Sequence, residues 1–176
     1  QAELIGLALA PPGPDRPHSI SSSASRLLDW WRARQPAVDW QGARLRNHSG
    51  LSVDSRLTPE QMTAVLRDEF VHPAGAAGLR HLLPISGMKG WLKNRLSEPA
   101  TALRVWAKTG TMDYAVGLAG YFHGADNRLR AFVIFINDLA LRRRAADGEA
   151  EIDAAVWNRR ARDAADLLVR GWIARF

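Results

Sequence analysis

The amino-acid sequence predicts an α+β fold in which helices come first, an antiparallel sheet follows, and a last helix covers the sheet. Apolar residues alternate over residues 104–122, on both sides of a turn at 112–114, and a further apolar run follows at 129–136. Near the C-terminus apolar residues recur at helical spacing: Ala161, Ala165, Leu168, Trp172 and Phe176. A single domain of this length can bury roughly two thirds of the surface that its unfolded chain exposes. These observations predict one domain of the α+β class.

The first two helices are expected near residues 1–10 and 19–35. The first carries apolar residues that could bury one face: Leu4, Ile5, Leu7, Ala8 and Leu9. Prolines between 11 and 17 end it, and because no capping residue precedes it, the chain is expected to begin inside an element. Serines at 19–23 can cap the second helix, which ends at Pro36. Its apolar positions are Ala24, Leu27, Leu28 and Trp31.

The third helix has the clearest local signal in the sequence. Thr58 is a suitable N-cap, Pro59 suits the first helical position, and Gln61 completes a capping box. Leu57 and Met62 have the spacing of a hydrophobic staple. One apolar stripe is expected along the helix, formed by Met62, Val65, Leu66 and Phe70.

Three strands are expected after a glycine-rich loop that follows Pro84. The alternation at 104–122 predicts two antiparallel strands joined by a short turn, and residues 123–128 have turn composition. The strand at 129–136 is apolar on both faces, which is typical of a central strand, so it is expected to have a neighbour on each side. One of those neighbours is expected to lie outside this sequence.

Composition narrows the class of protein. The net charge is +6, but positive residues are spread along the chain and only Arg142, Arg143 and Arg144 form a dense run, so a solvated cationic surface is favoured over a nucleic-acid-binding one. No apolar run approaches the ~18 residues of a membrane span. The absence of cysteine excludes disulfides and thiolate metal sites. Histidines are scattered, with only His72 and His81 loosely spaced, so we expect no metal site and no cofactor.

Lys108 lies in a predicted strand, at a position where the apolar alternation does not require any particular residue. With Thr109, Gly110 and Thr111 it supplies a cation, two hydroxyls and a position without a side chain, a set that suits a carboxylate ligand. The N–H after the glycine could face a developing oxyanion. The competing interpretation is an edge-strand lysine that only discourages aggregation.

Three segments in order resemble one enzyme family. They are "SGLSVDSRLTPEQM", "LLPISGMKGWLKNRL" and "RVWAKTGTMDYAVGLAGYF", and Lys-Thr-Gly is the third motif of penicillin-binding proteins and serine β-lactamases. Their order and approximate spacing resemble the D-alanyl-D-alanine carboxypeptidases/endopeptidases of the low-molecular-mass class C penicillin-binding proteins, the S13 peptidase family. The resemblance covers most of the chain and implies part of a transpeptidase-like domain in the periplasm or cell envelope.

The resemblance also implies what this sequence lacks. The family's nucleophilic Ser-x-x-Lys and its Ser-x-Asn motif lie upstream, so residues 1–176 are expected to be the C-terminal part of one penicillin-binding domain, and an upstream fragment of the same protein is a candidate partner. The implied activity is serine-type hydrolysis of D-Ala-D-Ala stem peptides of peptidoglycan through an acyl-serine, which β-lactams inhibit.

Carried onto this sequence, the resemblance gives each residue of the Lys-Thr-Gly segment a role. Lys108 holds the substrate's terminal carboxylate and tunes proton transfer, and Thr109 hydrogen-bonds that carboxylate. Gly110 leaves room for the peptide or the β-lactam ring, and the N–H of Thr111 is one oxyanion donor.

Other residues near these motifs are interpreted structurally. Ser86 and Lys89 match Ser-x-x-Lys on paper, but Pro84 and the glycines around them predict a loop, in which the lysine does not reach the serine oxygen. Ser49 and Gly50 are expected to form a turn, whereas Asn47 and His48 stand where the family has an acidic residue and receive no role. Trp106 shares a strand face with Lys108 and could shape the site or be buried.

Two other classes of function stay open. One is a binding module of the same fold that retains the carboxylate-holding strand without a nucleophile. The other, far below it, is a basic nucleic-acid-binding domain, which would bind DNA with steep salt dependence and would not react with β-lactams.

Overall fold

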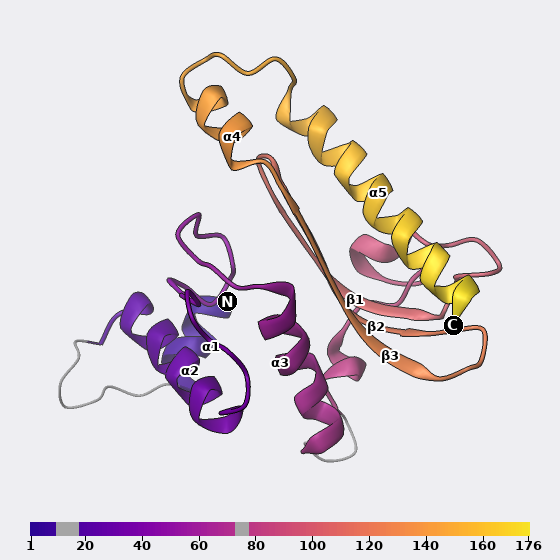
Figure 1. The fold of residues 1–176 in the computed structure, drawn as a ribbon, viewed down its shortest axis with the longest axis horizontal. Helices are drawn as coiled ribbons and strands as arrows, with labels where there is room; N and C mark the ends of the chain where they lie inside the picture. Colours follow the sequence, from indigo (N-terminus) through magenta and orange to yellow (C-terminus); the bar gives the residue numbers. More distant parts are fainter. Residues whose placement is uncertain (10–17, 73–77) are drawn as a thin grey trace. The chain divides into compact units, whose positions relative to one another are not determined.

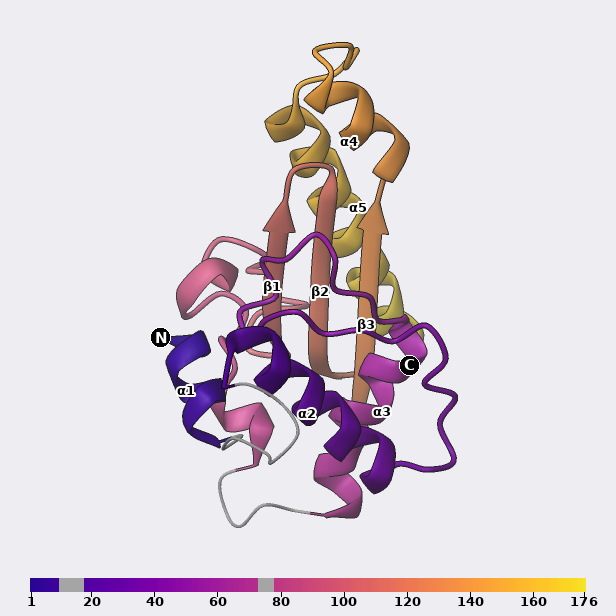
Figure 2. The same cartoon turned by 90° about the vertical axis from the view of Figure 1, so that its left-hand side faces the viewer.

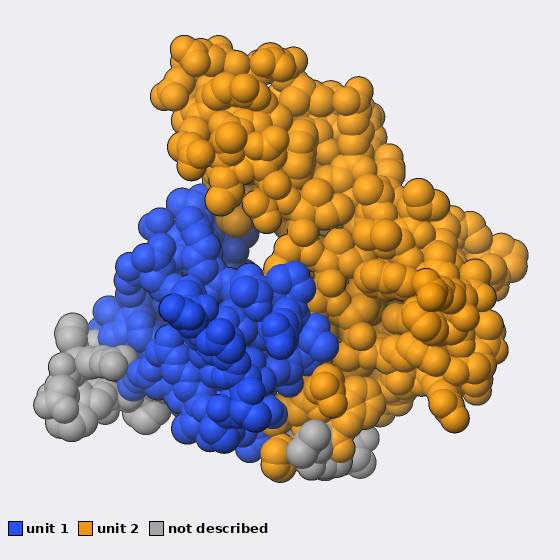
Figure 3. Space-filling view, viewed as in Figure 1, with its two compact units in different colours: residues 1–65 blue, residues 66–176 orange. Residues whose placement is uncertain are grey.

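The computed structural model describes residues 1–9, 18–72 and 78–176, which form two compact units, residues 1–65 and residues 66–176 (Figure 3). The proline-rich loop expected at 11–17 and most of the Gly/Ala-rich stretch before residue 79 lie outside the described residues. Each unit has its own apolar cluster.

The first unit contains helices α1 (Ala2–Leu9) and α2 (Ile20–Arg34). Ser19 caps α2 in a reciprocal capping box with Ser22, which confirms the predicted serine cap. The buried faces differ from expectation in α1, because only Gly6 is buried there. The apolar side chains of α1 that are exposed are Leu4, Ile5 and Leu9.

Helix α3 (Pro59–Val71) begins as predicted. The N–H of Thr58 donates to Gln61 Oε1 at 2.9 Å, and the N–H of Gln61 donates to Thr58 Oγ1 at 3.1 Å. Gln61 is buried, and its amide nitrogen also donates to the carbonyl of Asp39 at 2.9 Å. The cap therefore also holds the segment around Asp39, which follows α2. The apolar cluster of the first unit comprises Leu28, Trp40 and Ala43 with Trp31, Val38, Leu45, Leu57 and Val65 around them.

The second unit is built on a three-stranded antiparallel sheet, β1 (Val105–Met112), β2 (Ala115–His123) and β3 (Leu129–Asn137), in the order β1-β2-β3 (Figure 2). This confirms the predicted meander. Met112 pairs with Ala115, so the β1–β2 turn is Asp113-Tyr114, with Tyr114 at φ +55°. The tyrosine is buried and its hydroxyl donates to the carbonyl of Ile152 at 2.8 Å, which holds the turn in this conformation.

Strand β3 is not central among the described residues, in contrast to the expectation from its apolar faces. It pairs with β2 alone, and β2 is the central strand. The expected second neighbour of β3, from a portion outside this sequence, stays a prediction.

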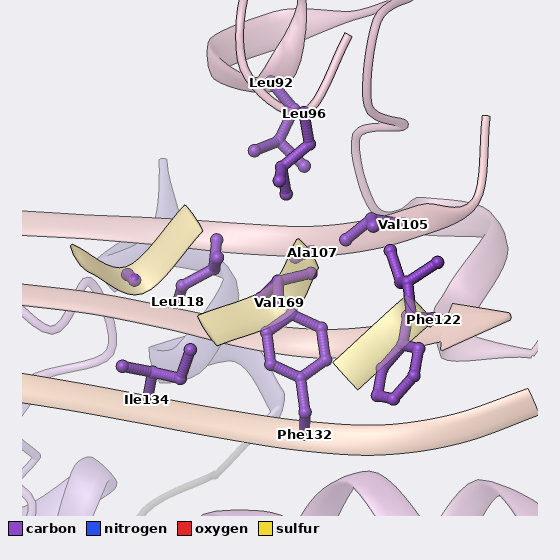
Figure 4. Packing of buried hydrophobic residues seen from close by; sticks show 11 residues of the cluster. Leu92, Leu96, Val105, Ala107, Leu118, Phe122, Phe132, Ile134 and Val169 are labelled. Carbon is purple, nitrogen blue, oxygen red and sulfur yellow. The ribbon is translucent and has the colours of Figure 1, made fainter. Parts of the chain in front are cut away.

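Helix α5 (Ala154–Arg175) lies along one face of the sheet, as Figure 1 shows. Asp153 caps α5, and Asp138 caps a short helix, α4 (Leu139–Ala146), that the sequence analysis did not predict. The prediction that Leu168 and Phe176 belong to the buried stripe of the last helix is wrong, because Leu168 is 46% and Phe176 is 42% exposed. The buried face steps through Ala161, Ala165, Val169 and Ile173. The core under α5 (Figure 4) comprises these last three residues with Leu92, Leu96, Val105, Ala107, Leu118, Phe122, Phe132 and Ile134.

The segment between α3 and β1 contains two short 3-10 turns, η1 (Leu79–Leu82) and η2 (Gly90–Leu92), and is tied to α5 by two ion pairs. Arg95 makes a bidentate pair with Asp166 at 3.1 and 2.7 Å, and both side chains are largely buried. Arg170 pairs with Glu98 at the surface. These pairs fix the segment that runs beside β1.

We expect the free energy of unfolding to fall in acid because of Glu98. Its hydrogen bond from Thr101 and its pairing with Arg170 lower the pKa from 4.5 to about 2. Because the folded pKa is the lower one, the stabilisation is present above pH 4.5 and is lost as the pH falls toward the folded value. We expect Glu98→Gln to flatten the fall in unfolding free energy over this window, measured by urea titration at several pH values.

The control is Glu60→Gln, which removes an exposed carboxylate without a side-chain ion pair among the described residues. The pH profile of Glu98→Gln should be flattened rather than flat, because Arg130 and the Arg128 N–H also hold the pKa of Asp126 well below its ordinary range. Parallel profiles for the protein and Glu98→Gln would contradict the prediction.

Candidate functional site

Lys108 lies on β1 with its side chain on the face opposite the α5-covered core. Its neighbour Ala107 is buried in that core, and side chains alternate along a strand, so Lys108 and Gly110 share the other face. Lys108 is exposed, and its ammonium donates a hydrogen bond to the carbonyl oxygen of Thr109. The cation is therefore held beside the edge of β1.

The outer edge of β1 is covered over only part of its length. The N–H of Ser86 donates to the carbonyl of Val105 at 2.9 Å, and the N–H of Ala107 donates to the carbonyl of Pro84 at 3.1 Å. These bonds show which residues present their backbone groups outward, and alternation gives Thr109 and Thr111 the same direction. Within this unit, the described backbone pairs with the edge no further than Ala107. The N–H groups of Thr109 and Thr111 thus face the open edge.

Gly110 leaves space at this edge. A Cβ added to it would meet no atom within 4 Å. Lys108, the bare Gly110 position and the outward N–H of Thr111 therefore lie together on one exposed stretch of strand.

The hydroxyls of Thr109 and Thr111 project to the other face of the sheet from Lys108. Thr109 pairs with Leu118, which belongs to the core on the α5 side, and Thr111 pairs with Val116. The backbone of Thr109, rather than its hydroxyl, contacts the ammonium of Lys108. The expected bond from the Thr109 hydroxyl to a carboxylate stays a prediction.

Ser86 and Lys89 lie in a loop, as predicted, and are not brought together. Ser86 is fully buried, and its hydroxyl donates to the carbonyl of Thr101 at 2.9 Å and accepts from the N–H of Val105 at 3.2 Å. Lys89 is exposed. Ser86 therefore fixes the start of β1.

Trp106 lies on the same face as Lys108 and is half-buried. The guanidinium of Arg80 lies over its ring at 5.2 Å, and the ring of His123 meets it edge-on at 5.4 Å. Arg80 was not predicted from the sequence to lie at this strand, because no local pattern links η1 to a residue on β1.

His48 belongs to a network in the first unit. The N–H groups of His48 and Ser49 donate to the carboxylate of Glu3 at 2.9 and 3.2 Å. Ser23 Oγ donates to the carbonyl of Gly6 at 2.9 Å and lies 2.8 Å from His48 Nε2. Because the serine proton is used on Gly6, Nε2 must carry the proton of the second bond.

This network ties α1, α2 and the turn at 47–50 together. Gly50 has φ +76°, and its N–H donates to Asn47 Oδ1 at 3.2 Å, which confirms the predicted turn. The hydrogen bonds from Ser49 and His48 lower the pKa of Glu3. His48 thus has a structural role that the sequence could not assign.

Residues 1–9, 18–72 and 78–176 contain no group of three histidine, aspartate or glutamate side chains that could hold a metal ion. None of their helices combines the length and apolar character needed to cross a bilayer.

A Lys-Thr-Gly strand at the open edge of an antiparallel sheet, with a C-terminal helix packed behind it, defines the class of penicillin-binding proteins and serine β-lactamases. Within that class, the chain belongs to the D-Ala-D-Ala carboxypeptidase 3 (S13) family, whose model matches residues 1–160. This confirms the family resemblance found in the sequence.

Two curated relatives show how much of the family's length is present. The chain is 34% identical over 128 residues to carboxypeptidase DacB of Mycolicibacterium smegmatis, covering 70% of this chain and 27% of the relative. It is 28% identical over 164 residues to D-alanyl-D-alanine carboxypeptidase DacB of Haemophilus influenzae, covering 78% of this chain and 34% of the relative. The chain therefore spans about a third of the length of these relatives.

Crystal structures confirm the fold. Penicillin-binding protein 4 of H. influenzae, complexed with a β-lactam, matches with a TM-score of 0.70 and 25% identity over 95% of this chain and 37% of its own. A penicillin G-acylated predatory endopeptidase of Bdellovibrio bacteriovorus has the same fold, with a TM-score of 0.59 and 16% identity over 97% of this chain and 45% of its own.

Replacement of Gly6 tests the His48 network. A Cβ at Gly6 would lie 2.1 Å from His48 Cγ, so Gly6→Ala must displace the ring that Ser23 holds. We expect a loss of about 1–3 kcal/mol in the free energy of unfolding, the usual range for overpacking, measured by urea titration.

The matched control is Gly171→Ala, since Gly171 also lies in a helix but a Cβ there would meet nothing within 4 Å. That variant should gain roughly 0.5–1 kcal/mol from helix propensity. A stabilised Gly6→Ala variant would show that the His48 ring can move without cost.

Proposed function

We propose that the protein is the C-terminal part of a serine-type D-alanyl-D-alanine carboxypeptidase/endopeptidase domain of the cell envelope that acts on peptidoglycan stem peptides. The observation that carries the proposal is the open edge of β1, where Lys108, Gly110 and the N–H of Thr111 lie together. Family membership and the carboxypeptidase names of the relatives support it.

In this proposal the stem peptide lies along the β1 edge as an added strand. The ammonium of Lys108 leaves the carbonyl of Thr109 and binds the terminal carboxylate. The N–H of Thr111 points outward and donates to the carbonyl oxygen of the scissile bond as it becomes an oxyanion. The missing side chain at Gly110 lets the substrate approach the backbone.

The nucleophile would come from an upstream portion of the same protein. Its serine oxygen adds to the carbonyl carbon of the penultimate D-Ala, the C–N bond breaks, and the terminal D-Ala leaves with a proton on its amine. Water then hydrolyses the acyl-serine. A β-lactam opens at its amide bond in the first step and retains its leaving nitrogen, so the acyl-enzyme persists. In the proposal β-lactams are thus inhibitors.

The upstream portion would also complete the sheet. The outer edge of β3 is unpaired among the described residues, and its strand is rich in apolar side chains. Edges of this kind are normally covered in native proteins. A strand from the upstream portion is the neighbour that the proposal assigns to it.

Lys108→Ala tests the cation at the edge. We expect acylation by a fluorescent penicillin, measured on this chain combined with its upstream portion, to slow by about 10- to 100-fold, because one hydrogen bond to a charged group is lost. Lys89→Ala removes an exposed lysine of the loop next to β1 and should leave the rate unchanged.

Peptide mapping of the adduct separates the possible outcomes. Label on the upstream portion that depends on Lys108 supports the enzyme. Label on Ser86 would contradict the structural role of that buried hydroxyl. Binding without any covalent adduct would favour the other candidate, a carboxylate-binding module of the same fold, which gains support from the absence of an accessible Ser-x-x-Lys pair among the described residues.

Thr111→Pro tests the oxyanion donor, because proline has no backbone N–H and is tolerated where that group faces away from the sheet. We expect acylation to slow by about 10²- to 10³-fold, the usual effect of one lost oxyanion donor. Thr111→Ala keeps the N–H and should react nearly as fast as the protein itself. Equal rates for the two variants, at equal unfolding midpoints, would remove Thr111 from the proposed mechanism.

A further inference from the structure

Helix α2 carries more serine than a helix interior favours. Four of its first six residues are Ser21, Ser22, Ser23 and Ser25, although serine competes with the helix backbone for hydrogen bonds. Ser22 serves the capping box and Ser23 binds His48. The other two are not explained by the capping or by the His48 network.

Both of these serines line a groove of about 560 Å³ in the first unit. Its walls are the serine-bearing side of α2 and the segment at 43–46, and its lining includes Arg32, Arg44 and Arg46. Leu45, between the last two, packs in the apolar cluster. Arg44 and Arg46, on either side of it, both line the groove and are exposed.

The charges in the groove do not cancel. Arg32 pairs with Asp29, the one acidic residue of the lining, at 3.0 Å. Arg44 uses its Nε on the carbonyl of Asp54 at 2.8 Å, which leaves its two terminal nitrogens as donors. Arg46 makes no side-chain hydrogen bond or ion pair with any residue that the structure describes, and the same holds for the hydroxyl of Ser21.

We infer that this groove binds an oxyanion ligand that carries two negative charges, such as a dicarboxylate or a phosphate. Guanidinium forks pair with planar or tetrahedral oxyanions, and a serine hydroxyl adds a donor that is neutral. Arg44 and Arg46 supply two positive charges that no acidic residue of the lining balances, and Ser21 donates from the opposite wall. Carboxylates and phosphates share this chemistry, and a titration distinguishes them.

The test is a titration of the ¹⁵N-labelled chain with sodium phosphate and, separately, with sodium glutarate at low ionic strength. We expect saturable shifts at the backbone amides of Ser21, Ser25 and Arg46, with the dissociation constant rising as salt is added. Tighter binding of glutarate identifies a dicarboxylate ligand, and tighter binding of phosphate identifies a phosphorylated one.

Arg46→Gln should weaken the binding by about three- to tenfold through the loss of one charge-assisted contact. Arg143→Gln is the matched control, because it removes the same charge from an exposed position of α4 in the other unit. Since Arg46 makes no described side-chain bond, its replacement leaves the fold intact. Ser21→Ala gives a second, charge-neutral test of the opposite wall.

If Arg46→Gln and Arg143→Gln weaken the binding equally, the binding depends only on the net charge of the chain, and the inference is overturned. Shifts that do not saturate, or that avoid α2, would also overturn it. Lys108→Ala should not change the titration, so this result is separate from the outcome of the proposed enzymatic function.

Discussion

The half-covered edge of β1 is the constraint on which the rest of the second unit depends. An edge strand exposes unpaired backbone groups, and proteins usually protect such edges. Here residues 84–86 cover the edge up to Ala107 and leave the next residues open. The open part begins at Lys108, whose cation is an edge-protecting group in its own right. A strand that must stay exposed in order to bind a ligand is thus protected by the residue that would bind it.

Several interactions far from Lys108 keep the cover in place. Ser86 is buried and satisfies both of its hydroxyl bonds on the backbone, so residues 84–86 cannot slide along β1 without leaving a buried polar group unpaired. The buried pair of Arg95 and Asp166 anchors the same segment to α5. Removing one partner of such a pair would leave an uncompensated buried charge. The pair therefore holds the segment that covers β1 in one position against α5.

The parts of the fold that the sequence predicts are those set by local patterns. The capping box at Thr58 and Gln61 involves residues three positions apart, and the hairpin follows from period-two alternation. The errors arise where partners lie far apart in sequence. Leu168 has a helical spacing that fits the core, but the sheet meets α5 along Val169, about 100° around the helix. The short helix α4 follows a single capping aspartate and was not predicted.

The candidate site divides in the same way. Lys108 and Gly110 could be placed on one strand face from alternation alone, whereas the direction of the backbone groups required knowledge of the partner on each side of β1. Arg80 over Trp106, and Glu3 beneath the turn at His48, are contacts that no pattern in the sequence encodes.

The surfaces left uncovered in this chain are consistent with a larger domain. The exposed apolar residues Leu4, Ile5 and Leu9 lie on one short helix, and β3 has one edge that no other described residue pairs with. Exposed apolar surface and free strand edges both favour association. The chain spans about a third of its relatives' length, and in the proposed function further segments of the same protein would provide the cover. Under the proposed function, a single upstream portion would supply the nucleophile, a second neighbour for β3 and the cover for α1.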